Sequence, residues 1–211
     1  MGIKERKERE KEQRRMMILD AAQELIINKG PEHITMEDIA EKAELAKGTL
    51  YLYFKSKDEI QYEISRRGTE ILNERTLKII DRTKTGLENL VRMGWEFVSF
   101  SNDEREFFNL FIFFHNIDLL KIDLPYERIE DYLLHHSPFT ILIELVEMGI
   151  KDGSLRSELS VIDTATALWS SLMGLLVIQE NKREIYQVFR VKPETVLNTA
   201  FDIILNGIKN R

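Results

Sequence analysis

The residues best suited to chemistry form a short series of hydrogen-bond donors near one quarter of the way along the chain. The members of this series are Lys47, Gly48, Thr49, Tyr51, Tyr53, Lys55 and Lys57. Lysine, threonine and tyrosine side chains bind phosphates or base edges, and glycine lets a backbone approach a nucleic acid closely. A helix that only packs into a core does not need this composition. The series therefore favours a helix that lies in the major groove of DNA.

A capping box at Thr35 and Asp38 predicts the start of a first short helix before this series. The hydroxyl accepts a hydrogen bond from an exposed amide, and the carboxylate lies near the positive end of the helix. Apolar residues then recur at helical spacing, at Met36, Ile39, Ala40 and Ala43. A tight turn at Glu44 follows, so the first helix is expected to position the second.

The second short helix and the one after it complete a three-helix unit. Leu45, Leu50 and Phe54 continue the buried face across the turn. Ser56 and Glu59 form another capping box, which predicts that a new helix begins there. These elements together predict a compact helix-turn-helix.

Several short words in this region occur together in one protein family. They are Ile18-Leu19-Asp20-Ala21-Ala22, Gly30, Thr35-x-x-x-Ile39-Ala40-Glu41-x-Ala43, Lys47-Gly48-Thr49-Leu50-Tyr51-x-Tyr53-Phe54, and Lys57 before an acidic residue. Residues 17–60 thereby resemble the DNA-binding domain of the tetracycline-repressor (TetR) family of bacterial transcriptional regulators. Glu44 and Ala46 depart from the family, which usually has Gly and often has Ser there. A left-handed Glu and a missing cap each cost about 1 kcal/mol, but neither removes a base-reading group.

The resemblance implies a homodimer that acts on DNA. The residues implied to read or approach bases are Lys47, Gly48, Thr49 and Tyr51, and those implied to hold phosphates are Thr35, Tyr53 and Lys57. Two such helices would enter successive major grooves of a pseudo-palindromic operator, about 35 Å apart. A repressor is the expected type of regulator, although an activator would use the same DNA-binding domain. A small-molecule effector would change the spacing of the two DNA-binding domains in the dimer.

Composition limits the class of protein. The chain has 211 residues, of which 43% are hydrophobic, with four prolines and ten glycines and almost no polar–apolar alternation. This predicts an all-α protein of about nine helices. The absence of cysteine excludes disulfides and thiolate metal sites and is typical of the cytoplasm. No apolar run approaches the ~20 residues that span a bilayer, and the charged start is unlike a signal sequence. We expect a soluble cytoplasmic protein without a membrane partner.

The net charge of −6 is unfavourable for DNA binding, but it is unevenly distributed. The first 57 residues are close to neutral, and the acidity lies in the remainder. DNA affinity should therefore depend on a few well-placed contacts and on dimerisation rather than on bulk attraction. The run of mixed charges over residues 4–15 has two interpretations: a solvated helix with paired charges, or an arm that reaches phosphates.

The chain is expected to divide into two functional parts. Residues 1–56 hold the charged extension and the helix-turn-helix, and residues 57–211 form a helical effector-binding and dimerisation domain. The expected helices are Met16–Asn28, Lys57–Asp81, Leu87–Phe100, Asp103–His115, Phe139–Lys151, Ile162–Glu180 and Glu194–Lys209. Pro125 opens a further helical stretch, which Pro138 interrupts.

The word Gly149-x-x-x-Gly153-x-Leu155-Arg156 is a second, weaker family resemblance. It predicts a helix that ends at Asp152, with Gly153 as a left-handed cap. After it, two helices carry small residues among apolar ones, which indicates close packing of helices. The expected dimer-interface residues are Ala167, Ser171, Gly174, Ala200, Phe201 and Ile204. The alternative is that these faces pack only within one subunit.

The middle of the chain is aromatic, which suits a site for an apolar or aromatic small molecule. The candidate pocket residues are Trp95, Phe107, Phe111, Phe114, His115, Phe139, Trp169 and Met173. The alternatives are a filled aromatic core and a regulator controlled by a protein partner. His135 and His136 follow Asp131 and Tyr132 by four residues, but no third ligand lies at metal-binding spacing. We expect no enzyme activity, cofactor or metal.

Overall fold

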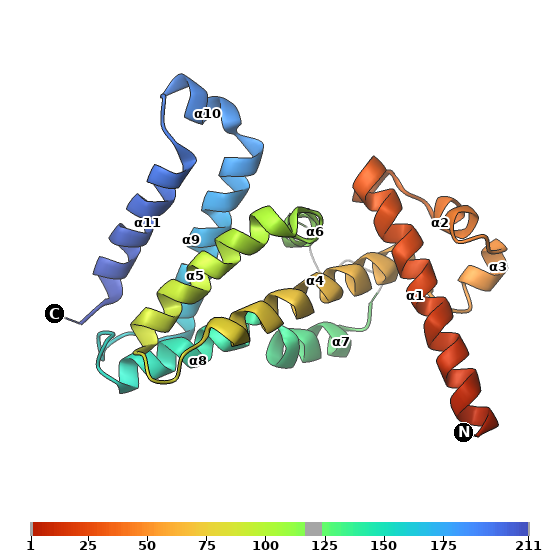
Figure 1. The fold of residues 1–211 in the computed structure, drawn as a ribbon, viewed down its shortest axis with the longest axis horizontal. Coiled ribbons are helices and arrows are strands. Elements are labelled where there is room, and N and C mark those ends of the chain that lie inside the picture. Colours follow the sequence, from red (N-terminus) through yellow and green to blue (C-terminus); the bar gives the residue numbers. More distant parts are fainter. Residues whose placement is uncertain (1, 117–123, 211) are drawn as a thin grey trace. The chain divides into compact units, whose positions relative to one another are not determined.

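The structure is a computed structural model that describes residues 2–116 and 124–210, without the side chains of residues 3 and 113–116 (Figure 1). Within these ranges the regular elements are helical, and the α-helices number eleven. They are α1 (Ile3–Lys29), α2 (Met36–Lys42), α3 (Lys47–Leu50), α4 (Lys57–Ile79), α5 (Gly86–Asp103), α6 (Arg105–Asn116), α7 (Tyr126–Asp131), α8 (Pro138–Lys151), α9 (Val161–Asn181), α10 (Arg183–Val188) and α11 (Pro193–Ile208). The all-α prediction is confirmed.

The long helices begin and end close to their predicted residues, and the differences have local causes. Helix α1 begins at Ile3 instead of Met16, because the charged run is itself helical. Arg6 and Glu10 form an ion pair of 2.8 Å there, and residues 4–14 are exposed. Helix α7 is the stretch predicted after Pro125, whereas short α10, between α9 and α11, was not predicted. Whether the charged run reaches phosphates stays a prediction.

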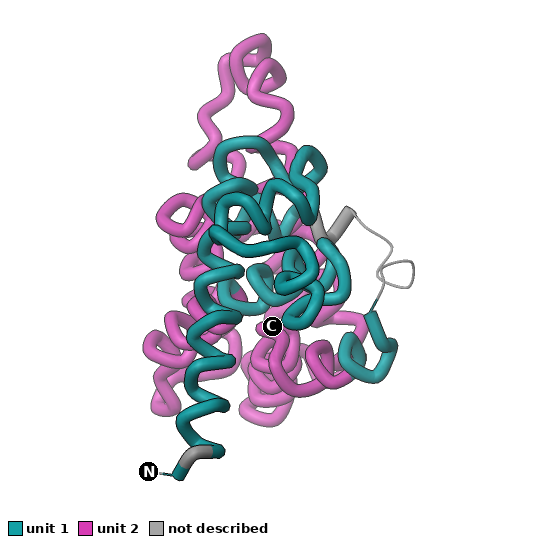
Figure 2. The backbone as a smooth tube through the Cα atoms, turned by 90° about the vertical axis from the view of Figure 1, so that its right-hand side faces the viewer, with its two compact units in different colours: residues 1–68, 106–130 teal, residues 69–105, 131–211 magenta. Residues whose placement is uncertain are grey.

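The described chain forms two compact units (Figure 2). The head unit is residues 1–68 and 106–130, and the body unit is residues 69–105 and 131–211. The head unit thus holds α1 to α3, the first half of α4, and almost all of α6 and α7. The predicted boundary between residues 56 and 57 separates two functional parts, whereas these units are defined by the packing of the chain. The functional boundary therefore stays a prediction.

Local signals determine the geometry of the head unit. The capping box is present: the Asp38 amide donates to the Thr35 hydroxyl at 3.1 Å, and the Thr35 amide donates to the Asp38 carboxylate at 2.9 Å. Glu44 has a φ of 54°, so it is left-handed as predicted. Ile18, Leu50 and Phe54 are fully buried. Apolar burial therefore fixes α1 against α2 and α3 and leaves the other side of α3 exposed.

The second family word joins three helices of the body unit. Gly153 has a φ of 76° and ends α8, as predicted. The Asp152 carboxylate accepts a hydrogen bond of 2.6 Å from the Gly86 amide at the start of α5. The Arg156 amide donates to the Ile208 carbonyl of α11 at 3.1 Å. A Cβ on Gly86 would lie 2.1 Å from the Gly149 nitrogen, so only glycine permits this approach of α5 and α8.

Helix α9 is unusually apolar for its exposure. Its 21 residues have a mean hydropathy of 1.7 in the most apolar window, of which 22% is buried. By length and composition it could cross a bilayer, a test that core helices of soluble proteins also pass. This differs from the expectation of no such segment, because leucine, isoleucine and valine raise the mean although Asp163 and several small polar residues interrupt the apolar run. An exposed apolar face on α9 therefore requires an explanation.

Candidate DNA interface and body cavity

Helix α3 and the turn that follows it expose several of the predicted donors, whereas Leu50 of α3 is buried. Lys47, Gly48 and Tyr51 are exposed, and Thr49 and Tyr53 are half-buried. A Cβ on Gly48 would meet no atom within 4 Å, so the fold of the chain itself does not require glycine there. A close approach by DNA would provide such a requirement. Ala46 makes no side-chain cap at the start of α3, as predicted.

Lys47 is already engaged in the structure. Its ammonium group donates to the Glu37 carboxylate of α2 and forms an ion pair with it. The hydrogen bond lowers the pKa of Glu37 and raises the pKa of Lys47. Both side chains are exposed, so the pair is readily exchanged for a contact with DNA. Glu37 thus holds the lysine at the exposed start of α3, a role that the sequence did not indicate.

The predicted phosphate-binding residues have partners of their own. The Thr35 hydroxyl is part of the helix cap and donates to Asp38 at 2.6 Å. Hydrogen bonds from Lys29 and then from Thr35 lower the pKa of Asp38 to about 2. The ammonium group of Lys57 donates to the Pro31 carbonyl at 3.4 Å. These two residues lie at helix starts, where a phosphate would meet a positive helix end.

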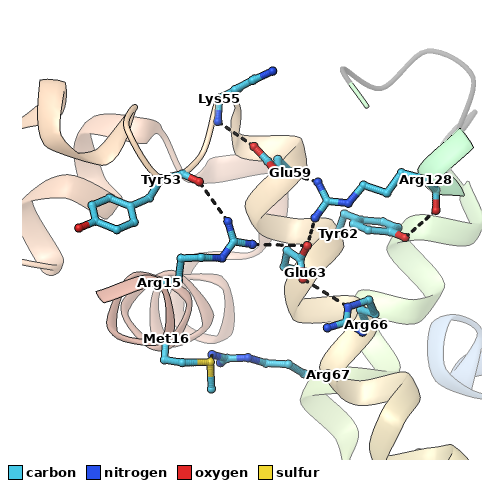
Figure 3. A network of polar contacts seen from close by, with 10 residues as sticks. All are labelled: Arg15, Met16, Tyr53, Lys55, Glu59, Tyr62, Glu63, Arg66, Arg67 and Arg128. Carbon is cyan, nitrogen blue, oxygen red and sulfur yellow. Dashed lines mark hydrogen bonds and ion pairs between the residues drawn. The ribbon is translucent and has the colours of Figure 1, made fainter. Parts of the chain in front are cut away.

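Arg15 joins α1 to the segment after α3 (Figure 3). Its guanidinium donates to the Tyr53 carbonyl at 3.1 Å and lies 4.3 Å from the centroid of the Phe54 ring. It also approaches the Glu63 carboxylate of α4 at 3.6 Å. Arg15 therefore positions the backbone of Tyr53, although in the sequence it is only the end of the charged run.

Glu63 is a buried carboxylate that contacts three arginines, one of which is Arg66, one turn later on α4 (Figure 3). Besides Arg15, it pairs with Arg128 of α7, whose guanidinium also binds Glu59 at 3.0 Å. Burial lowers the pKa of Arg128, but Glu59 and Glu63 outweigh it and leave the pKa raised. The other oxygen of Glu59 accepts from the Lys55 amide at 2.8 Å. This network connects α7 to the backbone segment that follows α3.

The body unit contains a cavity of about 70 Å³ between its helices. It is lined by Leu72, Thr76, Leu90, Met93, Gly94, Phe97, Pro138, Leu142, Leu168, Trp169, Leu172, Leu175, Phe201, Ile204 and Leu205. Of the predicted pocket residues, Trp169 lines it, and Phe139 packs edge-on against Trp169 at 6.5 Å. Trp95 stacks on Phe201 at 4.6 Å, and Met173 is buried on α9.

The other predicted pocket residues do not join this cavity. Phe107 and Phe111 belong to the head unit, where Phe107 packs over Gly68. The side chains of Phe114 and His115 lie outside the described residues. Most of the lining is aliphatic, and sequence reasoning missed it because leucines at helical spacing look the same in a filled core.

The predicted interface residues lie on the two C-terminal helices. Ala167, Ser171 and Gly174 of α9 are exposed, and Ala200 and Ile204 of α11 are half-buried. A shallow groove runs along this face, lined by Ser170, Ser171, Gly174, Leu175, Ile178, Tyr186, Val196, Ala200, Ile203 and Ile204. Phe201 instead points inward, where its ring covers Gly94 of α5.

Residues 18–64 match the family model described as bacterial regulatory proteins, tetR family. The chain is 29% identical over 149 residues to the HTH-type transcriptional repressor KstR2 of Mycolicibacterium smegmatis, with 70% of each chain covered. It is 24% identical over 204 residues to the fatty acid metabolism regulator protein of Bacillus subtilis, covering 96% of this chain and all of the relative.

Solved structures show the same fold. A putative transcriptional regulator from Saccharomonospora viridis, solved in complex with choline, has a TM-score of 0.70 at 20% identity, with 93% and 98% of the two chains covered. KstR2 of Mycobacterium tuberculosis has a TM-score of 0.62 at 21% identity, with 94% and 96% covered. Head, fold and relatives define a DNA-binding transcriptional regulator and not an enzyme. The DNA-binding region of the chain, residues 18–64, is that of the TetR family.

Proposed function

We propose that the protein is a repressor that binds a pseudo-palindromic operator as a homodimer and leaves it when an apolar or aromatic small molecule binds. The observation that carries this proposal is the division of α3 into a buried face and an exposed face of DNA-binding donors. Named relatives that are repressors support the direction of control. The protein acts in the cytoplasm, where its operator lies.

In this proposal Lys47, Gly48, Thr49 and Tyr51 read or approach bases. The exposure of Lys47, Gly48 and Tyr51 and the open space at Gly48 support this role. Thr35, Tyr53 and Lys57 hold phosphates and fix the register of the head on the duplex. The proposed role of Tyr53 is supported by its fixed position, because Arg15 donates a hydrogen bond to the Tyr53 backbone carbonyl.

The dimer forms through the groove face of α9 and α11. A helix with a mean hydropathy of 1.7 and 22% burial leaves apolar area exposed in a single chain. Its small residues allow a second copy to approach closely, and the two-fold pairing of the same face gives a closed four-helix interface. Each copy then contributes one head, which doubles a set of contacts that is too weak alone.

Effector control rests on the body cavity. Its lining comes from α4, α5, α8, α9 and α11. A ligand there acts only by binding one arrangement of these helices more tightly than another. A structural neighbour holds choline, which supports small-molecule binding by this fold. Residues 57–211 form the effector-binding and dimerisation part, and residues 1–56 the reading part.

A second candidate function keeps the DNA-reading head but replaces the small molecule by a protein partner. Short α10 supports it, because Val188 and Phe189 are 73% and 72% exposed and offer apolar side chains to a partner. In that case the body cavity would stay empty in the regulated state.

Selection of bound sequences from a random DNA pool, with and without small-molecule extracts, tests the proposal. We expect a two-fold symmetric site with half-sites one helical turn apart, and loss of selection with an active extract. An asymmetric site would contradict the dimer, and a site whose occupancy rises with an active extract would contradict release by the effector. An occupancy that responds only to a protein fraction would favour the second function.

A further inference from the structure

A buried threonine lines the body cavity. Thr76 of α4 is fully buried and lines the cavity, and within the described part of the chain its hydroxyl oxygen has no hydrogen-bond partner. A buried hydroxyl without a partner is costly, and most such groups in folded proteins are satisfied. Thr69, two turns earlier on the same helix, shows the usual state: its hydroxyl shares a hydrogen bond of 2.8 Å with the Tyr132 hydroxyl.

Water is a poor partner for Thr76. A cavity of about 70 Å³ is large enough for water by volume. A buried water needs two to four polar partners, however, and among the other lining side chains only the Trp169 indole carries a polar atom; the rest are leucine, isoleucine, methionine, proline, glycine and phenylalanine. The cavity therefore suits a molecule that brings one polar group to Thr76 and covers the remaining walls with hydrocarbon.

The chemistry of the walls also decides the charge of that molecule. No lining residue that the structure describes is ionisable. The neighbouring Arg75 is engaged elsewhere: its guanidinium binds Glu96 at 2.5 Å and Asp103 at 2.8 Å. A carboxylate or an ammonium group in the cavity would lose its hydration without gaining a counter-charge. A neutral alcohol or ketone loses much less hydration free energy when it enters the cavity.

We propose that the body cavity binds a neutral, narrow apolar molecule with a single oxygen function, an alcohol or a ketone, and that the Thr76 hydroxyl makes its hydrogen bond. The small volume selects a slender chain rather than a fused ring system. The regulatory consequence rests on the proposed effector control, but the binding does not.

Titration of the full-length protein with 1-hexanol, hexane, hexanoate and hexylammonium tests this ligand class. Tryptophan fluorescence is a suitable readout because Trp169 lines the cavity. We expect saturable binding of 1-hexanol and binding of the two ions at least tenfold weaker. Hexanoate or hexylammonium that binds as tightly as 1-hexanol would overturn the proposal.

Variants at Thr76 test the hydrogen bond. Thr76→Val keeps the shape and should weaken 1-hexanol about fivefold while leaving hexane unchanged. Thr76→Ser should restore the affinity for 1-hexanol. The matched control Thr69→Val should leave the ratio of the affinities for 1-hexanol and hexane unchanged. Equal affinity of 1-hexanol for the wild type and Thr76→Val would overturn the role of Thr76, and the thermal unfolding of each variant establishes that it is folded.

Operator binding with saturating 1-hexanol separates the two proposals. Thr76-dependent binding of 1-hexanol without any change in operator affinity would support the ligand class and contradict effector control at this cavity. Release of the operator by hexanoate, with no dependence on Thr76, would support effector control and overturn the ligand class.

Discussion

Glu63 shows how single residues connect distant parts of the head unit. Its carboxylate is buried, and its partners Arg15 and Arg128 come from positions 48 residues before and 65 residues after it. No local pattern in the sequence indicates such a pairing, because the charges meet only once α1, α4 and α7 have packed. The capping boxes were predictable because their partners are three residues apart.

Removing the charge of Glu63 should destabilise the head unit. Glu63→Gln removes the counter-charge that Arg15, Arg66 and Arg128 share, and we expect a loss of about 2 kcal/mol, below the range for fully buried pairs because all three arginines reach solvent. Urea unfolding measures the loss. Glu10→Gln, which breaks the exposed pair with Arg6, should change stability by under about 0.5 kcal/mol. Equal stability of Glu63→Gln and Glu10→Gln would show that the Glu63 carboxylate does not hold α1, α4 and α7 together.

The cap at Asp38 should make stability depend on acid pH. Its pKa falls from an ordinary value of 3.8 to about 2, so its stabilising contribution is complete above pH 3.8 and disappears as pH falls through about 2. Asp38→Asn should therefore flatten this part of the curve of melting temperature against pH. Glu41→Gln, on the same helix, should keep the wild-type curve, and an identical flattening in both variants would exclude Asp38 as the cause.

At the scale of elements, the sequence predicted what depends on local signals. Helix ends at Gly30 and Gly153, the left-handed Glu44 and the three-helix head follow from caps, turns and periodicity within a few residues. The body cavity was not predictable in the same way. Its walls come from five helices and are mostly aliphatic, so only the packed structure distinguishes them from a filled core.

The close approach of α5 and α8 gives a prediction at this scale. Gly86→Ala would place a Cβ 2.1 Å from a backbone nitrogen, which cannot move without shifting a helix, so we expect a loss of about 3 kcal/mol or more. Thermal unfolding measures it. Gly207→Ala in α11 meets no atom within 4 Å and should stabilise by up to about 1 kcal/mol. Tolerance of Gly86→Ala would contradict the helix contact.

At the scale of the whole molecule, the proposed dimer would make up for an acidic chain with few basic residues near DNA. The net charge of −6 gives little bulk attraction, so the proposal needs two heads that act together on one operator. The composition of α9 suggested the interface, because small residues among apolar ones favour close packing. Its exposure, which only the packed structure provides, supports the proposal that a second copy covers it.

A charge in the groove should separate the subunits. Ser171 is exposed on α9 and lines the groove, so Ser171→Arg should give a monomer in analytical ultracentrifugation at micromolar concentration and weaken operator binding. Glu147→Arg, on an exposed position of α8, should stay dimeric. A Ser171→Arg protein that remains a dimer with full operator affinity would place the interface elsewhere.

The most direct test of the reading helix is the operator affinity and base preference of Tyr51→Ala, measured by fluorescence anisotropy on the selected operator and on single-base variants of it. Tyr51 is 45% exposed at the C-terminal end of α3, and both subunits of the proposed dimer carry it, so we predict a loss of about tenfold or more and a relaxed preference at the contacted base pair. Tyr126→Ala removes another exposed tyrosine, on α7, and should bind like the wild type. Unchanged affinity and unchanged base preference in Tyr51→Ala would contradict the assignment of α3 as the helix that reads DNA.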